Sequence, residues 1–292
     1  MPAAPQPVTL DDGCPECVPA RGRGACGEIP HEIWRRTIPY EGPRPWFELG
    51  AAVQGRTLSA YIAEMCGRFT RNYTWEQIRA LYRLTAPSAI PNLQPRFNAC
   101  PTDPADTIVE REGKRELVEM RWGLVPFWWS KPLKELRLAT FNARVETVTT
   151  KPFFREPFKS KRCLMPVSGY YEWQDTPEGK QPWYFTARDG SPVLTIAGLW
   201  DEWKNRETGE RLKSCAMIIS EPNEFVAEVH DRMPVLLKPG QFEHWLSGDM
   251  GAEELKSVDN DYLQRWAVSK RINSSKADSN DSSLIDAVRQ AA

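Results

Sequence analysis

Cys66 stands directly after Met65 in the stretch MCGRF. If synthesis starts at Met65, removal of that methionine leaves Cys66 with a free α-amine and a thiol on one residue. An α-amine has an unperturbed pKa of about 8, so part of it is neutral at pH 7 and can condense with an aldehyde to an imine. The neighbouring thiol can then close a five-membered ring. The alternative is a buried structural cysteine, because free cysteine is usually a core residue.

Two further side chains could move protons near pH 7. Glu172 lies between aromatic residues in the strand-like stretch YYEW, and apolar surroundings raise the pKa of a carboxyl group. His230 is one of three histidines in the chain, and imidazole titrates near neutral pH. The alternatives are a solvated Glu172 on an alternating strand and a His230 that holds a loop, with Asp231 as its partner.

Short β-type runs are the elements that must position these residues. They are TIVER and ELVEMRW around the hairpin-like Glu112-Gly113-Lys114, and then RCLMPVSGYYEW, PWYFTAR, VLTIAGLW and SCAMIIS. A capping box that starts at Thr74 predicts a helix over 74–84. Shorter helices are expected at Asn223–Val229 and Gln241–Leu246. Many short strands with a few helices predict an α+β domain on a curved, barrel-like, mostly antiparallel β core.

The composition changes after the first 64 residues, which are rich in Gly and Pro and contain six Arg but no Lys. Breakers interrupt every periodic pattern there, so we predict that 1–64 is mostly unstructured, or that it is upstream sequence read from an early start codon. We expect a single domain at 65–282 and a C-terminal tail at 283–292. The stretch Asn273–Ser283 is rich in Ser, Asp and Asn, and we predict a mobile tail, with which a short terminal helix is also compatible.

Charge and composition exclude several classes of protein. The 292 residues contain 38 Lys and Arg against 39 Asp and Glu, so the net charge of -1 offers no overall attraction for nucleic acid, although a local basic groove remains possible. No apolar run approaches the roughly 18 residues that span a bilayer, and no secretory signal is present. We therefore expect a cytoplasmic protein that does not bind membranes.

The seven cysteines indicate reduced thiols, because their number is odd and their spacing is irregular. Cys14 and Cys17, followed by Cys26 and His31, have the ligand types for zinc but not a standard spacing. We therefore expect no metal and no cofactor.

Seven stretches occur in the order that is typical of one family. They are Cys66–Phe69, Arg96–Asn98 with Pro101, Arg121–Pro126, Asn142–Thr147, Gly169–Trp173, Ala197–Trp200 and His230–Pro234. On these motifs the sequence resembles the SRAP family, the SOS-response-associated putative peptidases, from Cys66 to about Ser282. Members bind single-stranded DNA and crosslink covalently to abasic sites. The resemblance implies a single SRAP-type domain.

The resemblance also implies catalytic roles. Cys66 would attack the ring-opened aldehyde of an abasic deoxyribose through its amine and close a thiazolidine through its sulfur. Asn142, which would otherwise be interpreted as a turn residue or helix cap, would hydrogen-bond the linkage without adding charge. Glu172 would do acid–base work during ring opening and imine formation. His230 would donate a proton to the sugar oxygen and accept one back.

Arg68 and Arg144 match family positions that hold DNA phosphates, where a guanidinium can form two parallel hydrogen bonds. Each is otherwise compatible with a solvated surface arginine. Trp122 and Trp128 supply aromatic surface on which bases could stack, although core packing is the commoner fate of tryptophan and we expect Trp122 to be mainly a core residue. Basic and aromatic residues at 151–162 suggest a second patch along the strand.

One departure from the family pattern affects the chemistry. With 1–65 attached, the Cys66 nitrogen is an amide and cannot form an imine. Either translation begins at Met65, which we favour, or the extension is removed by proteolysis, or crosslinking has been lost.

The resemblance therefore implies a sensor of abasic sites in single-stranded DNA with lyase-like crosslinking activity, which we expect to be monomeric and nucleoid-associated. One alternative is a thiol autopeptidase that uses Cys66, His230 and Glu172 and cleaves before Cys66. The other is a non-covalent single-stranded DNA-binding module in which Cys66 is structural.

Overall fold

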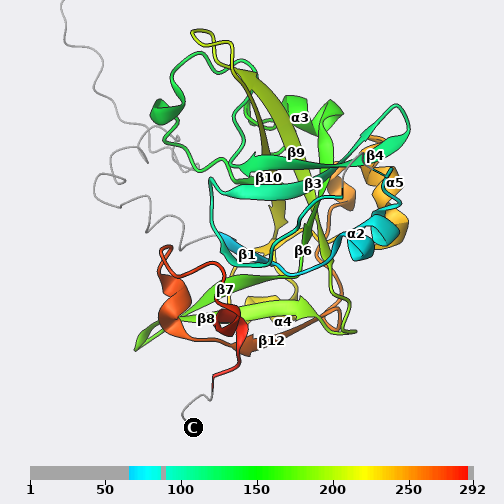
Figure 1. Ribbon diagram of the computed structural model, residues 1–292. Helices are drawn as coiled ribbons and strands as arrows, with labels where there is room; N and C mark the ends of the chain where they lie inside the picture. Colours follow the sequence, from blue (N-terminus) through cyan, green and yellow to red (C-terminus); the bar gives the residue numbers. More distant parts are fainter. Residues whose placement is uncertain (1–65, 87–89, 289–292) are drawn as a thin grey trace, which may run out of the picture. The chain divides into compact units, whose positions relative to one another are not determined.

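Five strands close into a barrel in the computed structural model, which describes residues 66–86 and 90–288. Strand β10 pairs with both β4 and β9, and the remaining pairings run from β4 through β3 and β6 to β9, so the ring is complete (Figure 1). The five strands are β3 (Pro104–Arg111), β4 (Lys114–Trp122), β6 (Arg162–Val167), β9 (Leu194–Lys204) and β10 (Arg211–Ser220). All pairings in the ring are antiparallel except that of β4 with β10. Two short strands, β5 (Asn142–Arg144) and β11 (Met233–Pro234), pair with β10.

A second, fully antiparallel sheet has the strand order β12-β8-β7-β1-β2 (Figure 1). Its strands are β1 (Arg68–Arg71), β2 (Arg96–Ala99), β7 (Gly169–Thr176), β8 (Gly179–Ala187) and β12 (Leu263–Ala267). Strand β7 follows β6 of the barrel after a single residue, so the chain passes directly from one sheet to the other. The predicted α+β class with a barrel-like, mostly antiparallel core is confirmed.

Local sequence signals explain where several elements begin and end. Thr74 caps helix α2 (Trp75–Tyr82) in a capping box with Gln77, as the sequence predicted, and the helix buries Trp75, Ile78 and Tyr82. The β3–β4 hairpin turns at Glu112 and Gly113, whose φ angles of 51° and 71° match the twist of the strands.

The other helices are short. They are α3 (Arg155–Ser160), α4 (Glu224–Ala227) and α5 (Phe242–Leu246), with 3-10 turns η2 (Leu133–Glu135), η3 (Pro239–Gln241), η4 (Ala252–Glu254), η5 (Lys270–Asn273) and η6 (Ser282–Ile285). Helices α4 and α5 fall where the sequence predicted helices, whereas α3 was not predicted. No helix among the described residues is long and apolar enough to cross a membrane.

The prediction that Asn273–Ser283 is mobile is wrong. The Ser279 carbonyl accepts a hydrogen bond from the Phe97 amide at 2.6 Å, and the Ala277 carbonyl accepts one from Asn98 Nδ2 at 2.9 Å. Polar side chains of this segment close local turns although most of them are exposed, as when Asp281 accepts from the Ser283 amide. Its backbone thereby lines the edge of β2. The predictions made for 1–64 lie outside the described residues.

Candidate active site

Four residues that are far apart in the sequence meet near the start of β1. Cys66 precedes β1, Asn142 begins β5, Glu172 lies within β7, and His230 follows α4. Asn142 Nδ2 donates a hydrogen bond to the Cys66 carbonyl oxygen at 3.0 Å. His230 Nδ1 lies 3.7 Å from Glu172 Oε2, and the Glu172 carboxyl interacts electrostatically with the Cys66 thiol. The structure thus brings together all four residues for which catalytic roles were predicted, although their roles remain predictions.

Buried polar atoms without hydrogen-bond partners concentrate at this site. The described residues contain six such side-chain atoms, and four of them belong to three residues of the site: Asn142 Oδ1, Tyr170 OH and both Glu172 oxygens. Buried polar groups are nearly always satisfied in a folded protein, so each exception needs an explanation. An arrangement of acceptors and one hydroxyl around a cysteine is suited to holding a polar group that the protein itself does not supply.

Burial sets the protonation of the two reactive groups. It raises the pKa of Glu172 to about 7, against the opposing influence of His230 and then of the Cys66 thiol. A carboxyl with that pKa exists in both forms near neutral pH, so it can both donate and accept a proton. Burial, and then the neighbouring Glu172, raise the pKa of the Cys66 thiol well above its ordinary value. The thiol is therefore protonated at rest.

His230 is held in place by the loop that follows α4. The Arg232 amide donates a hydrogen bond to His230 Nδ1 at 3.1 Å, and Asp231 Oδ1 lies 3.5 Å from the same nitrogen. Arg232 in turn forms an ion pair with Glu146, which follows β5. The His230 imidazole is therefore fixed beside Glu172. The stretch HDRMP, which is typical of the family, contains both this imidazole and the residues that hold it.

Alternation along β7 divides its side chains between two faces. Tyr170 and Glu172 lie on the face toward Cys66, which we call the reaction face, and Tyr170 shares a hydrophobic cluster with Cys66. Tyr171 and Trp173 lie on the opposite face, which we call the anchoring face, in a separate cluster. Tyr170 was not singled out from the sequence, yet its position two residues before Glu172 on a strand was enough to place it on the same face.

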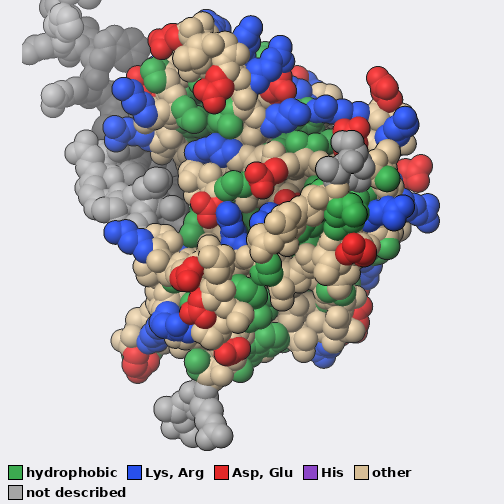
Figure 2. Space-filling model, in the orientation of Figure 1, with side chains coloured by type: hydrophobic (Ala, Val, Ile, Leu, Met, Phe, Trp, Pro, Cys, Tyr) green, Lys and Arg blue, Asp and Glu red, His purple; other side chains and the backbone are tan. Residues whose placement is uncertain are grey.

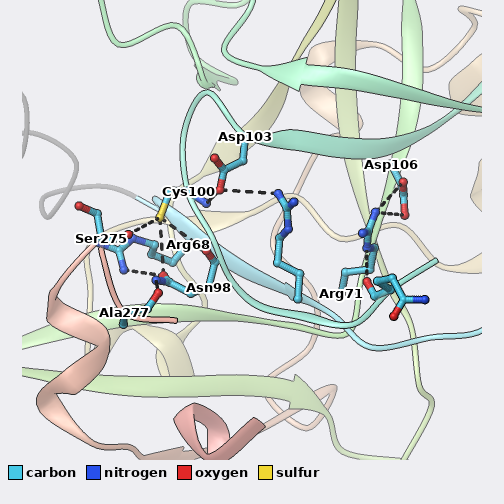
Figure 3. Close-up of polar contacts among 10 residues, drawn as sticks. Arg68, Arg71, Asn98, Cys100, Asp103, Asp106, Ser275 and Ala277 are labelled. Atoms are coloured by element: carbon cyan, nitrogen blue, oxygen red, sulfur yellow. Dashed lines mark hydrogen bonds and ion pairs between the residues drawn. The ribbon is translucent and has the colours of Figure 1, made fainter. Parts of the chain in front are cut away.

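Arg68 pairs with Tyr171 across β1 and β7 and therefore belongs to the anchoring face. Its side chain lies beside Asn98 (Figure 3). Only 5% of the residue is exposed, and its Nη1 donates to Asn98 Oδ1 at 2.8 Å and to the Ile272 carbonyl at 2.7 Å. Its guanidinium carbon lies 5.7 Å from the centre of the Trp173 ring. The predicted phosphate contact would require Arg68 to leave these partners, so its role in this structure is to connect β1 with β2 and the C-terminal segment.

Trp122 is a core residue, as expected for its main role. It is fully buried, its Nε1 donates to the Phe141 carbonyl oxygen at 3.0 Å, and its ring meets Phe69 edge-on with 4.9 Å between ring centroids. No face of the ring is open to a base, so the stacking predicted for Trp122 has no surface in this structure.

Trp128 is 38% exposed, and its ring meets Phe153 edge-on with 5.2 Å between centroids. The preceding Phe127 is 56% exposed, and we call the exposed rings of these two residues, Trp128 and Phe127, the aromatic platform. Side chains of the barrel hold the backbone beneath the platform. Ser214 Oγ accepts from the Val125 amide at 2.8 Å, and Asp201 Oδ2 accepts from the Phe127 amide at 2.9 Å. The backbone of the platform is therefore fixed, and its exposed rings can stack with bases.

A cavity of about 610 Å³ lies beside the platform, and its lining includes Phe127, Trp128, Arg155 and Lys161. Its lining contains none of the four predicted catalytic residues. Arg144, the other predicted phosphate ligand, is exposed at the end of β5, two residues after Asn142. Acidic and basic side chains are interspersed on the face drawn in Figure 2, so any basic groove is local.

No group of three or more His, Cys, Asp or Glu residues in the described ranges could hold a metal ion. Cys14, Cys17, Cys26 and His31, which were considered as zinc ligands, lie outside those ranges.

Comparison with known proteins gives a consistent result. Residues 65–275 match the family model described as SOS response associated peptidase (SRAP). The abasic site processing protein YoaM of Bacillus subtilis is 33% identical over 228 residues, which cover 76% of this chain and 98% of that protein. The abasic site processing protein YedK of Escherichia coli is 27% identical over 197 residues, which cover 66% of this chain and 85% of that protein.

Solved structures have the same fold. A protein from Bacteroides thetaiotaomicron superposes with a TM-score of 0.67 at 25% identity, covering 77% of this chain and all of the other. A protein from Bordetella bronchiseptica superposes with a TM-score of 0.60 at 26% identity, covering 70% of this chain and all of the other.

Proposed function

The chain belongs to the SOS response associated peptidase family, and from that membership we propose that it processes abasic sites in single-stranded DNA by forming a covalent crosslink through Cys66. Its relatives are named abasic site processing proteins. The observation that carries the proposal is the group of unpartnered buried polar atoms on Asn142, Tyr170 and Glu172, gathered around a cysteine. A ring-opened sugar brings the aldehyde and hydroxyl groups that such atoms can bind.

The reaction proceeds without oxidation or reduction. The Cys66 α-amine attacks the aldehyde carbon of the opened sugar, and the carbonyl electron pair moves to oxygen, which takes up a proton. Loss of this oxygen as water leaves an iminium, and the Cys66 sulfur adds to its carbon while the thiol proton is released. The product is a thiazolidine, and one water is lost overall. Closure of the ring is favoured because the amine and the thiol belong to the same residue.

Glu172 and His230 move the protons that these steps require. Ring opening needs a proton on the sugar ring oxygen and removal of one from the anomeric hydroxyl, and loss of water needs a proton on the departing oxygen. Glu172, with a pKa of about 7, can supply and remove protons in turn. His230 Nδ1 lies 3.7 Å from Glu172 Oε2, beyond hydrogen-bond distance, so a proton passes between them when the two side chains approach or when a water bridges them. Asn142 already holds the Cys66 carbonyl and has a free acceptor for the sugar or the new ring.

The proposal requires a free α-amine on Cys66. Translation from Met65 followed by removal of that methionine supplies one, and so does cleavage of the bond between Met65 and Cys66. Met65 lies outside the described residues.

The site supports repeated peptide cleavage by Cys66 less well than it supports crosslinking. A thiol peptidase needs a lowered cysteine pKa so that the thiolate forms readily. Burial and Glu172 do the opposite here. Crosslinking is compatible with a thiol that is protonated at rest, because the Cys66 α-amine attacks first and the thiol loses its proton only in the last step.

Single-stranded DNA is bound by exposed side chains outside the buried site. Trp128 and Phe127 offer stacking faces, and each stacked base contributes about 1–3 kcal/mol. Arg144 adds a charge close to Asn142. We place this activity in the DNA damage response, in a monomer that acts in the cytoplasm at the nucleoid.

A crosslinking assay with an oligonucleotide that carries one abasic site tests the proposal. The protein, prepared to begin at Cys66, is expected to form an adduct that survives denaturation. Cys66→Ala should abolish the adduct, and Asn142→Ala should reduce it strongly. Cys100→Ala is the matched control, because Cys100 is a free, partly exposed thiol on the other side of β1, and it should crosslink normally.

A second oligonucleotide with a tetrahydrofuran in place of the abasic sugar has no aldehyde. It should be bound but not crosslinked. An adduct with this oligonucleotide, or an undiminished adduct in Cys66→Ala, would contradict the proposal.

A further inference from the structure

Tyr170 carries a hydroxyl whose position in the fold is unusual. The residue is only 1% exposed, and its hydroxyl has no hydrogen-bond partner. A buried hydroxyl without a partner destabilises the folded protein, because it has given up its bonds to water. Phenylalanine would fill the same space without that cost. The hydroxyl therefore needs a reason to be there.

The position of Tyr170 points to the reaction. It lies two residues before Glu172 on β7, so both side chains emerge from the reaction face. It packs in the same cluster as Cys66, and its hydroxyl interacts electrostatically with both Glu172 and Cys66. Its ring stacks on Phe185 with 5.0 Å between centroids and an interplanar angle of 9°, which fixes its direction.

The neighbouring tyrosine shows that an unsatisfied hydroxyl is not a general property of this sheet. Tyr171 is equally buried, but it lies on the anchoring face and donates to the Phe97 carbonyl oxygen at 2.7 Å. Tyr184, on the adjacent strand β8, shares a hydrogen bond of 2.8 Å with the Thr70 hydroxyl. Only the tyrosine beside Cys66 and Glu172 lacks a partner among these three.

We propose that the Tyr170 hydroxyl is a further catalytic group, which donates a hydrogen bond to the aldehyde oxygen of the ring-opened sugar as the Cys66 α-amine attacks. This inference rests on the proposed crosslinking function and adds a residue to its chemistry. When the nitrogen–carbon bond forms, the carbonyl π pair moves to that oxygen, and the resulting negative charge is stabilised by a donor already in place. The tyrosine keeps its proton, and Glu172 supplies the proton with which the oxygen leaves as water.

The electrostatics of the site are compatible with this role. Burial, followed by the charges of Glu172 and Cys66, raises the pKa of Tyr170 well above its ordinary value. The phenol therefore stays protonated wherever the reaction runs and remains a donor. Asn142 Nδ2 donates one of its two N–H groups to the Cys66 carbonyl, and the unpartnered atom of this side chain is its acceptor Oδ1.

Tyr170→Phe tests the proposal, with Tyr171→Phe as the matched control from the opposite face. Three quantities are measured for each protein: the single-turnover rate of crosslinking at saturating DNA, the affinity for the tetrahydrofuran oligonucleotide, and the Tm. Tyr170→Phe should slow crosslinking by about 10- to 100-fold, as expected for loss of one donor to a developing oxyanion. Its affinity should equal that of the wild type, and its Tm should be equal or higher.

Tyr171→Phe should show the reverse pattern, with a lower Tm and an unchanged crosslinking rate. A Tyr170→Phe protein that crosslinks at the wild-type rate would overturn the inference. So would a slower rate accompanied by a matching loss of Tm, because that pattern belongs to a structural residue. If the wild-type protein itself forms no adduct, the proposed function fails, and the inference fails with it.

Discussion

The two faces of β7 use buried polar groups in opposite ways. On the anchoring face most buried polar atoms have partners: Tyr171 donates to the Phe97 carbonyl, and Trp173 Nε1 donates to Asn273 Oδ1 at 2.8 Å, whereas Arg68 Nε is the exception. On the reaction face, Tyr170 and Glu172 have no hydrogen-bond partners, although they are equally buried. The backbone is the same strand in both cases and each face carries a tyrosine, so the difference comes from the groups that surround each side chain.

This difference separates stability from function. Satisfied groups on the anchoring face connect β1, β2 and the C-terminal segment, and they hold the sheet together. Unsatisfied groups on the reaction face lower stability, and a protein keeps such groups where they do chemistry. Substitutions on the anchoring face should therefore change the free energy of unfolding, whereas substitutions on the reaction face should change the rate of crosslinking.

The largest effect is expected for Glu172→Gln. Glutamine keeps the shape of the side chain but can neither accept nor donate a proton as a carboxyl does, so the crosslinking rate should fall by about 10²- to 10⁴-fold. Single-turnover kinetics with the abasic oligonucleotide measure this. Glu178→Gln, in the exposed β7–β8 turn, is the control and should react normally. Equal rates for Glu172→Gln and the wild type would remove the distinction between the two faces.

Arg68→Met tests the anchoring face. The substitution keeps most of the apolar volume but removes the charged donors to Asn98 and to the Ile272 carbonyl. Loss of these bonds should lower the free energy of unfolding by about 4 kcal/mol, as measured by denaturant titration. Arg206→Met, at an exposed position, is the control. If Arg68→Met kept its stability and instead weakened DNA binding in a salt-dependent manner, Arg68 would be a phosphate ligand.

A smaller effect is expected from the titration of Glu172. Its ordinary pKa of 4.5 applies to the unfolded chain, and the folded value is about 7. The folded protein therefore favours the neutral carboxyl over the carboxylate. The stability that depends on a neutral Glu172 is fully present below pH 4.5 and is lost as the pH rises to about 7. The free energy of unfolding of the wild type should fall by about 3 kcal/mol relative to Glu172→Gln over that range. Parallel pH profiles of the two proteins would contradict this account.

Local signals in the sequence predicted the parts of the fold that depend on neighbouring residues. The capping box at Thr74 marked the start of α2, and Glu112-Gly113 marked the β3–β4 turn. The anchoring of the C-terminal segment could not be found in this way, because its partners Arg68 and Asn98 are more than 170 residues away in the chain. A polar composition alone therefore suggested mobility where tertiary hydrogen bonds impose order.

Sequence signals were also insufficient to predict every residue of the site. The family motifs identified Cys66, Asn142, Glu172 and His230, and the structure brings all four together. Motifs did not separate Arg68, which is buried, from Arg144, which is exposed. Nor did they single out Tyr170, because an unpartnered hydroxyl is a property of the folded surroundings and not of the residue type.

The central claim is that Cys66 reacts through a free amino terminus, and intact-mass spectrometry tests it most directly. The protein is expressed from its native gene and measured before and after incubation with the abasic oligonucleotide. The account predicts a mass that begins at Cys66, and an adduct equal to protein plus oligonucleotide minus one water. A mass that begins at Met1, with no adduct, would contradict it.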